Sequence, residues 1–240
     1  MLKFFSKIRQ KLLSENKISK YLLYAIGEIA LVVIGILIAV KINNWNEAKK
    51  KKEVEIEILS QFKEDLKDDI ESINRVDLWV QKAINSSKIV VDHLKNERAW
   101  HDTLAIHFDL WNDYDHLGLN TVAISNLRSR GVEIVSNKEL RKNIIQLYDN
   151  WYFYIKKSND NFREDHIYLS YPKYLQHIEP VKWRVAGVPS DYDALLKDKE
   201  FINTVQWIRN AAEFTSEFYL LTIQEIQKVI NDIDLELEKF

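Results

Sequence analysis

A run of 21 residues from Leu22 to Ile42, LLYAIGEIALVVIGILIAVKI, constrains this chain more than any other feature. As a helix it would be about 31 Å long, which is enough to cross the hydrocarbon core of a bilayer. A signal peptide would have a shorter apolar part followed by a small-residue cleavage site, whereas this run continues into INNWNE without an A-x-A pattern. We therefore predict a permanent transmembrane anchor over residues 21–47, with Trp45 as an interfacial anchor in the aromatic belt.

Charge is distributed unevenly around this anchor. Of the 34 Lys and Arg and the 36 Asp and Glu, residues 1–52 hold 11 and 3, which leaves 23 and 33 for residues 53–240. Residues 1–20 mix basic and apolar side chains, so we predict an amphipathic interfacial segment that lies on anionic lipid head groups. The acidic remainder argues against nucleic acid as a partner.

The orientation of the anchor is judged from the charges at its two ends. Lys41 and lysines 49–52 on one side nearly balance the basic residues on the N-terminal side, so the positive-inside rule favours neither orientation strongly. A short basic N-terminus with an in-plane helix favours the cytoplasmic side, and long domains translocate largely regardless of their charge. We expect the N-terminus inside and the C-terminal domain outside the cytoplasm.

Glu28 lies within the apolar run, where an ionisable side chain is costly and usually faces protein or water. On a helix, Gly35 and Ala39 share its side, and such a small-xxx-small pair lets a second helix approach closely. We therefore expect Glu28, Gly35 and Ala39 to mediate homo-oligomerisation or binding to a membrane-protein partner. The alternative is that Glu28 is protonated or reaches toward the head groups.

Two stretches of the chain resemble a known family. YAIGEIALVVIGILIAVKINNWNE, preceded by FFSKIRQKLLSENK, resembles the start of bacterial single-pass membrane proteins of the domain of unknown function 6090. SNLRSRGVEIVSNKELRKNIIQLYDNWY is similar to a motif in their soluble domain, so the resemblance covers residues 1–50 and about 121–155. It implies an anchor in the bacterial inner membrane that carries a helical domain, here periplasmic, and it brings no catalytic residues.

The rest of the chain has the pattern of an all-α domain. Five glycines and three prolines among 240 residues leave few turns. Apolar residues recur every three or four positions from about 48 to 97 and again toward Phe240. We therefore predict an elongated antiparallel helical bundle over residues 48–240, with a long helix at each end.

Shorter elements are expected between these two helices. Gly131 is placed to end one helix, and Ser136 with Glu139 forms a capping box that would start the next, so we predict a helical hairpin over residues 121–155. All three prolines fall within residues 171–190, which we predict to be an irregular segment.

Chemically versatile side chains are densest in HDTLAIHFDLWNDYDH, residues 101–116. On a helix, Asp109, Asp113 and His116 would align and could bind a divalent metal. However, HExxH-type spacing is absent and apolar residues already define a buried side, so a solvated polar face is the better interpretation. We expect no metal, no cofactor and no catalytic residue, because the chain also lacks cysteine, a phosphate-binding glycine loop and a G-x-S-x-G elbow.

Aromatic residues crowd positions 148–154, and they are too many for one core stripe. We expect Trp151, Tyr152 and Tyr154 to form an exposed surface for a partner, and the alternative is that they pack beneath the proline-containing segment. Together these features favour a membrane-anchored, non-enzymatic interaction protein, a scaffold or accessory subunit of a bacterial envelope complex. The alternative is an extracytoplasmic bundle that senses a ligand and signals through its transmembrane helix to a partner.

Overall fold

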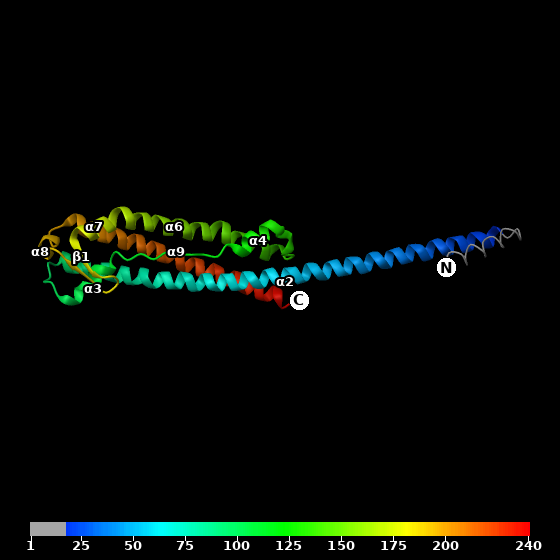
Figure 1. Ribbon diagram of the computed structural model, residues 1–240, viewed down its shortest axis with the longest axis horizontal. Coiled ribbons are helices and arrows are strands. Elements are labelled where there is room, and N and C mark those ends of the chain that lie inside the picture. The colour runs from blue at the N-terminus through cyan, green and yellow to red at the C-terminus, as the bar shows by residue number, and fades with distance from the viewer. Residues whose placement is uncertain (1–17) are drawn as a thin grey trace. The chain divides into compact units, whose positions relative to one another are not determined.

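The computed structural model describes residues 18–240, and the chain divides into two units, Met1–Val54 and Glu55–Phe240. Helix α2 (Ile18–Lys95) contributes to both units. The predicted interfacial segment lies outside the described residues, apart from its last three residues, which begin α2. Helices dominate the structure, so the prediction of an all-α protein is confirmed (Figure 1).

The second unit continues from residue 55 of α2 through a series of shorter helices, one hairpin and a long final helix. Its elements are η1 (Asp102–Leu104), α3 (Ala105–Leu110), α4 (Val122–Arg130), η2 (Val132–Ile134), α5 (Lys138–Gln146), η3 (Leu147–Tyr152), α6 (Phe153–Asp165), η4 (His166–Ser170), α7 (Tyr171–His177), β1 (Ile178–Lys182), β2 (Ala186–Pro189), α8 (Tyr192–Leu195) and α9 (Lys199–Leu237). Here η1 and η2 are 3-10 helices, whereas η3 and η4 are π-helices, which join α5, α6 and α7 end to end.

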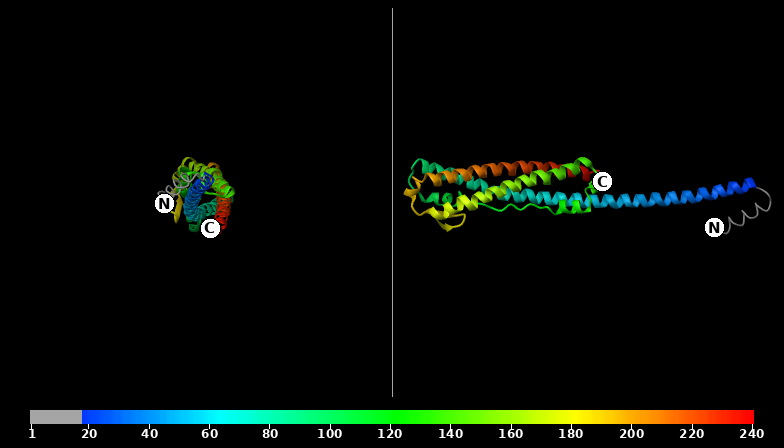
Figure 2. Two further views of the ribbon diagram at one scale, coloured as in Figure 1. Left: turned by 90° about the vertical axis from the view of Figure 1, so that its right-hand side faces the viewer. Right: turned by 90° about the horizontal axis from the view of Figure 1, so that it is seen from above.

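Three long segments form the body of this unit: α2, the run from α5 to α7, and α9. Lys63 pairs with Asp234 and Lys88 with Glu213, so α9 runs antiparallel to α2. Helix α6 packs along α9 as well (Figure 2). Their facing sides supply most of the core, whose largest fully buried side chains include Phe62, Phe201 and Tyr219, together with Trp111 directly after α3. The prediction of an elongated antiparallel bundle is therefore confirmed for this unit.

An extended connection between α3 and α4 runs back along α2 and is drawn as a thin green trace beside it in Figures 1 and 2. Ser72 donates its hydroxyl to the Gly118 carbonyl (2.9 Å), and Asn120 donates its backbone N–H to Asp69 (2.7 Å). A helix through residue 116, on which Asp109, Asp113 and His116 would align, does not form, because α3 already ends at Leu110. The Asn and Asp residues that follow favour turns over helix interiors.

The proline-containing segment is regular, which corrects the predicted irregular stretch over residues 171–190. Pro172 lies in the first turn of α7, directly after the π-helix η4. The other two prolines belong to a two-stranded antiparallel hairpin, in which the pairing register shifts after Pro180 and β2 ends at Pro189. Proline is tolerated at such edges and irregularities. Strand β2 packs on α3, so the hairpin joins the short helices at one end of the unit (Figure 1).

Candidate functional site

The first unit presents an apolar surface. Every large aliphatic side chain from Leu22 to Ile42 is exposed in the structure, and the most apolar 18-residue window of this helix has a mean hydropathy of 2.5 and no buried residue. Within residues 18–240 it is the one helix that is long and apolar enough to cross a membrane. An apolar surface of this size is typical of a site that contacts lipid or another protein.

The predicted association face lies on this helix. Gly35 and Ala39 are exposed, and apart from its chain neighbours and the backbone of its own helix, no described atom lies within 4 Å of the point that a Cβ on Gly35 would occupy. Glu28 is half-buried, and Trp45 is 69% exposed. A second helix could therefore approach this face closely, whereas association itself and the interfacial role of Trp45 stay predictions.

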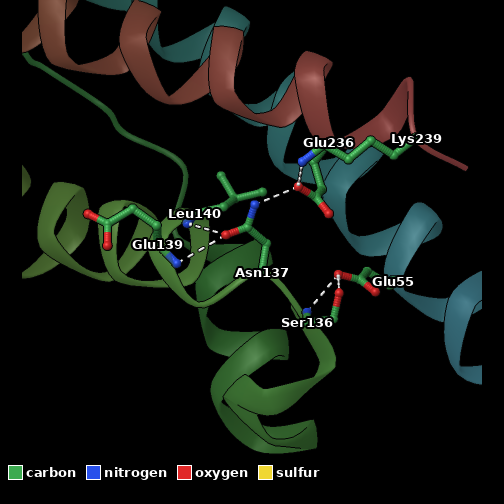
Figure 3. A network of polar contacts seen from close by, with 7 residues as sticks. All are labelled: Glu55, Ser136, Asn137, Glu139, Leu140, Glu236 and Lys239. Atoms are coloured by element: carbon green, nitrogen blue, oxygen red, sulfur yellow. Dashed lines mark hydrogen bonds and ion pairs between the residues drawn. The ribbon is translucent and has the colours of Figure 1, made fainter.

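A polar network in the second unit connects the turn before α5 to α2 at Glu55 and to the C-terminal end of α9 (Figure 3). We call this network the clasp. Ser136 donates its backbone N–H (2.6 Å) and its hydroxyl (2.9 Å) to Glu55. The Asn137 amide donates to Glu236 (2.6 Å), which also accepts from Lys239 (2.7 Å). The hydrogen bonds from Lys239 and Asn137 lower the pKa of Glu236, so its carboxylate is ionised at neutral pH.

The clasp also explains why the predicted capping box is wrong. Asn137 is the N-cap of α5, and its side-chain oxygen accepts from the backbone N–H groups of Glu139 (3.1 Å) and Leu140 (3.2 Å) (Figure 3). Ser136, which the box placed at the cap, is instead turned toward Glu55. A tertiary contact therefore moves the helix start by one residue.

Two acids and two tyrosines form a buried cluster between α2 and η3, the acid–tyrosine cluster. It comprises Asp65, Asp69, Tyr148 and Tyr152. Asp69 accepts from the Tyr152 hydroxyl and from the Asn120 backbone N–H (2.7 Å). Burial raises the pKa of Asp69 to about 6, although these two hydrogen bonds oppose that rise. The Tyr148 hydroxyl is buried without a partner in the described part of the chain.

The predicted partner surface over residues 151–154 is only partly exposed. Tyr152 is 5% exposed and bonded to Asp69, so its assignment to this surface is wrong. The π-helix η3 is the reason, because its wider turn places Tyr152, five residues after the buried Leu147, on the side that faces α2, whereas an α-helix would place Trp151 there. Trp151 is half-buried, while Tyr154 is exposed beside Phe153, with ring centres 5.6 Å apart.

A cleft of about 300 Å³, which we call the aromatic cleft, lies where residues 109–114 meet η4, α7 and the hairpin. Its walls include five ring side chains, Tyr114, His166, Tyr171, Tyr174 and Trp183, and three polar side chains, Asp109, Asn112 and Asp113. The Tyr174 hydroxyl donates to Asp109 (2.7 Å), and burial raises the pKa of this phenol, so it stays a donor at neutral pH.

The hairpin tip closes one side of this cleft. Arg184 donates from Nε to both carboxylate oxygens of Asp113 (3.1 and 2.9 Å). Its guanidinium carbon lies 3.7 Å from the ring centre of Trp79 and 4.5 Å from that of Trp183. Arg184 adopts a positive φ of 58°, a strained conformation for a residue with a side chain.

The three residues considered for a metal do not come together. Asp109 and Asp113 both line the aromatic cleft, but their hydrogen-bond partners are Tyr174 and Arg184. His116 lies beyond the end of α3 and lines a different cleft. Within the part of the chain that the structure describes, no group of three His, Cys, Asp or Glu is placed to hold a metal ion. The helical alignment on which that alternative depended does not exist.

These observations define an all-α protein that carries one long apolar helix and a separately packed helical unit. The chain belongs to the family of unknown function DUF6090, whose model matches residues 28–168. The match covers Glu28, Gly35 and Ala39, the clasp residues before α5, and the acid–tyrosine cluster, and it ends before the hairpin. No curated protein and no solved structure matches the chain.

Proposed function

We propose that the protein is a non-enzymatic, membrane-anchored interaction protein that serves as a scaffold or accessory subunit of a bacterial envelope complex. The observation that carries this proposal is the apolar surface from Leu22 to Ile42, which is attached to a unit that buries its own core. The anchor holds the helical unit at the lipid bilayer, and the unit contacts other envelope proteins. No nucleic acid is involved.

The proposed orientation has the N-terminus in the cytoplasm and residues 55–240 in the periplasm, with a single pass through the inner membrane. The short basic N-terminal segment supports this orientation, because positive charge near an anchor is retained on the cytoplasmic side. A reporter fused after Phe240 should be active only if it is a periplasmic reporter. Activity of a cytoplasmic reporter at that site would refute the orientation and leave the anchor itself intact.

In this proposal the anchor also associates with another helix, from a second copy or from a partner. The basis is the row of Glu28, Gly35 and Ala39, where small residues allow close helix approach and a carboxyl group can hydrogen-bond across the contact. The open space beside Gly35 is consistent with such a contact.

Purification of the tagged full chain from native membranes in a mild detergent tests the proposal. We expect mass spectrometry to find one stoichiometric partner protein, or a homo-oligomer. The double variant Gly35→Leu with Ala39→Leu should lose this association. The matched control, Val33→Leu with Val40→Leu, adds bulk to the opposite side of the helix and should keep it. A monomer without a partner, or equal association of both double variants, would contradict the proposal.

The second candidate function is ligand sensing, in which the helical unit binds a small molecule and signals through the anchor to a partner. The aromatic cleft favours it, because convergent polar groups within aromatic walls are typical of small-molecule sites. A ligand that changes the association of the anchor would distinguish a sensor from a scaffold.

A further inference from the structure

We propose that the aromatic cleft binds a small organic ammonium ion, the cationic group of a primary or alkylated amine. This inference concerns the second unit alone and depends neither on membrane anchoring nor on a protein partner. It goes beyond the proposed scaffold function, and three independent features of the cleft support it.

The first feature is a buried carboxylate without a counter-charge. Asp109 is 8% exposed, and its one hydrogen-bond partner in residues 18–240 is the Tyr174 hydroxyl, which is neutral. No ion pair to Asp109 is formed within that range. Asp113, four residues later, does form an ion pair, with the Arg184 guanidinium. Because a desolvated charge normally has a partner of opposite sign, Asp109 is suited to receive a cation from solution.

The second feature is an acceptor without a donor. Asn112 lines the same cleft, its side chain is 6% exposed, and its Oδ1 has no partner among the described residues. Buried polar atoms are nearly always hydrogen-bonded, so an orphan of this kind calls for an explanation. The Asn112 oxygen is itself closed to solvent, so a ligand that donates would satisfy it together with Asp109 once the amide turns toward the cleft. An ammonium ion carries both the donors and the charge.

The third feature is the aromatic wall. Tyr114 stacks on His166 with ring centres 5.5 Å apart, and Tyr171 with Trp183 extends the same lining. Aromatic faces attract cations, above all alkylated ammonium groups. The chain already shows this chemistry beside the cleft, where the Arg184 guanidinium lies over the Trp183 ring. Burial lowers the pKa of His166, so its ring is neutral at pH 7 and does not repel a cation.

The local charge excludes an anion as the favoured ligand. Asp109, Asp113 and Asp115 gather where Arg184 supplies the one ion-paired guanidinium, so negative charge is in excess. Arg163 also lies near Tyr114, but Asp160 and Asp115 offset its effect there. A cleft of about 300 Å³ is at the small end of ligand sites, which fits a compact amine better than a nucleotide or a peptide.

Calorimetric titration of the full chain in lauryl maltoside tests the proposal, since this detergent carries no ammonium group. The probes are choline, its neutral carbon isostere 3,3-dimethyl-1-butanol, and n-butylammonium. We expect at least one of the two cations to bind. If choline binds, its affinity should be about tenfold or more higher than that of its uncharged isostere. A blank titration into detergent micelles corrects for partitioning.

Variants connect the binding to the named residues. Asp109→Asn keeps an acceptor for Tyr174 but removes the charge, and it should weaken cation binding about tenfold or more. Asp193→Asn is the matched control at an exposed acid outside the cleft and should leave binding unchanged. Trp183→Leu, at an exposed hairpin tip, should weaken binding several-fold. This last variant keeps the test decisive if the Asn variant does not fold.

Three results would overturn the proposal. One is the absence of binding by both cations up to about 10 mM, a concentration that detects even weak sites. Another is equal binding of choline and its uncharged isostere, because the cleft would then select shape and not charge. The third is unchanged cation binding in a folded Asp109→Asn variant and in Trp183→Leu, which would place the site elsewhere on the chain.

Discussion

The hydroxyl of Tyr152 in η3 donates a hydrogen bond to the carboxylate of Asp69 in α2, and both side chains are buried. The contact joins two segments that run side by side although they are 83 residues apart in the chain. It also gives a specific role to the π-helix, which turns this tyrosine inward. Replacing either residue should therefore affect the packing of α2 against η3.

Tyr152→Phe should lower the free energy of unfolding by about 1–3 kcal/mol, because a buried carboxylate loses one of its donors. The matched control is Tyr154→Phe two residues later, where the phenol is exposed and the change should stay within about 0.5 kcal/mol. Thermal or denaturant unfolding of the full chain in detergent measures both. Equal effects of the two substitutions would mean that the Tyr152 hydrogen bond contributes no stability.

Asp69 should make the stability depend on pH. Its pKa rises from 3.8 to about 6 on folding, chiefly through burial, so the folded state binds more protons than the unfolded state between these values. The contribution is present below about pH 3.8 and is lost as pH rises through about 6, with a total of up to about 3 kcal/mol. Asp69→Asn should abolish this component. The free energy of unfolding of the wild type, taken relative to that of the variant, should therefore fall from pH 4 to pH 7. A difference that stays constant over this range would contradict the raised pKa.

Gly187→Ala should detach the hairpin from α3. A Cβ at this position would lie 2.8 Å from Ile178 Cγ2, which is closer than such atoms approach, and 3.3 Å from the Asp109 Cα, which is a tight contact. We expect a loss of about 1–3 kcal/mol in stability and faster amide exchange in β1 and β2. Gly118→Ala is the control, since no described atom beyond its two chain neighbours lies within 4 Å of the added carbon. Unchanged amide exchange in β1 and β2 of the Gly187→Ala variant would show that the hairpin accommodates the added methyl group and stays packed on α3.

The clasp should hold the start of α5. Asn137→Ala removes both the N-cap and the hydrogen bond to Glu236, so we expect a loss of about 1–2 kcal/mol and faster amide exchange in the first turn of α5. Asn126→Ala, on the exposed side of α4, is the matched control and should change little. If the amide exchange rates in the first turn of α5 are equal in the two variants, the cap and the clasp do not determine the stability of this turn.

Periodicity and turn residues predicted the long helices and the end of α4 at Gly131, because these depend on local pattern. The same reasoning failed at Ser136 and Tyr152, where a partner far along the chain decides the outcome. A capping signal cannot reveal that Glu55 competes for Ser136, and a 3.6-residue period cannot reveal a π-helix. The helical alignment of Asp109, Asp113 and His116 fails for a local reason, since the Asn and Asp residues after Leu110 favour a turn.

The aromatic cleft was largely hidden in the sequence. Its residues come from 109–114 and 166–183, and neither stretch indicates a shared site by itself. The pattern around Asp109 and Asp113 indicates a metal site only on a helix that continues to residue 116, and α3 ends at Leu110. The prolines predict an irregular segment, although two of them, Pro180 and Pro189, lie in the strands of the hairpin that closes the cleft. A pattern of Trp183–Arg184 between two short apolar stretches was the one available signal for that hairpin.

The π-helix η3 makes the effect of a one-residue deletion depend on where the deletion falls. Its backbone hydrogen bonds span five residues instead of four, so η3 holds one residue more than an α-helix would need to join α5 to α6. Removing one residue from η3 should therefore convert it to α-helix and leave Phe162 and His166 facing Tyr114. Removing one residue from the first turns of α6 should instead rotate both side chains by about 100° away from Tyr114.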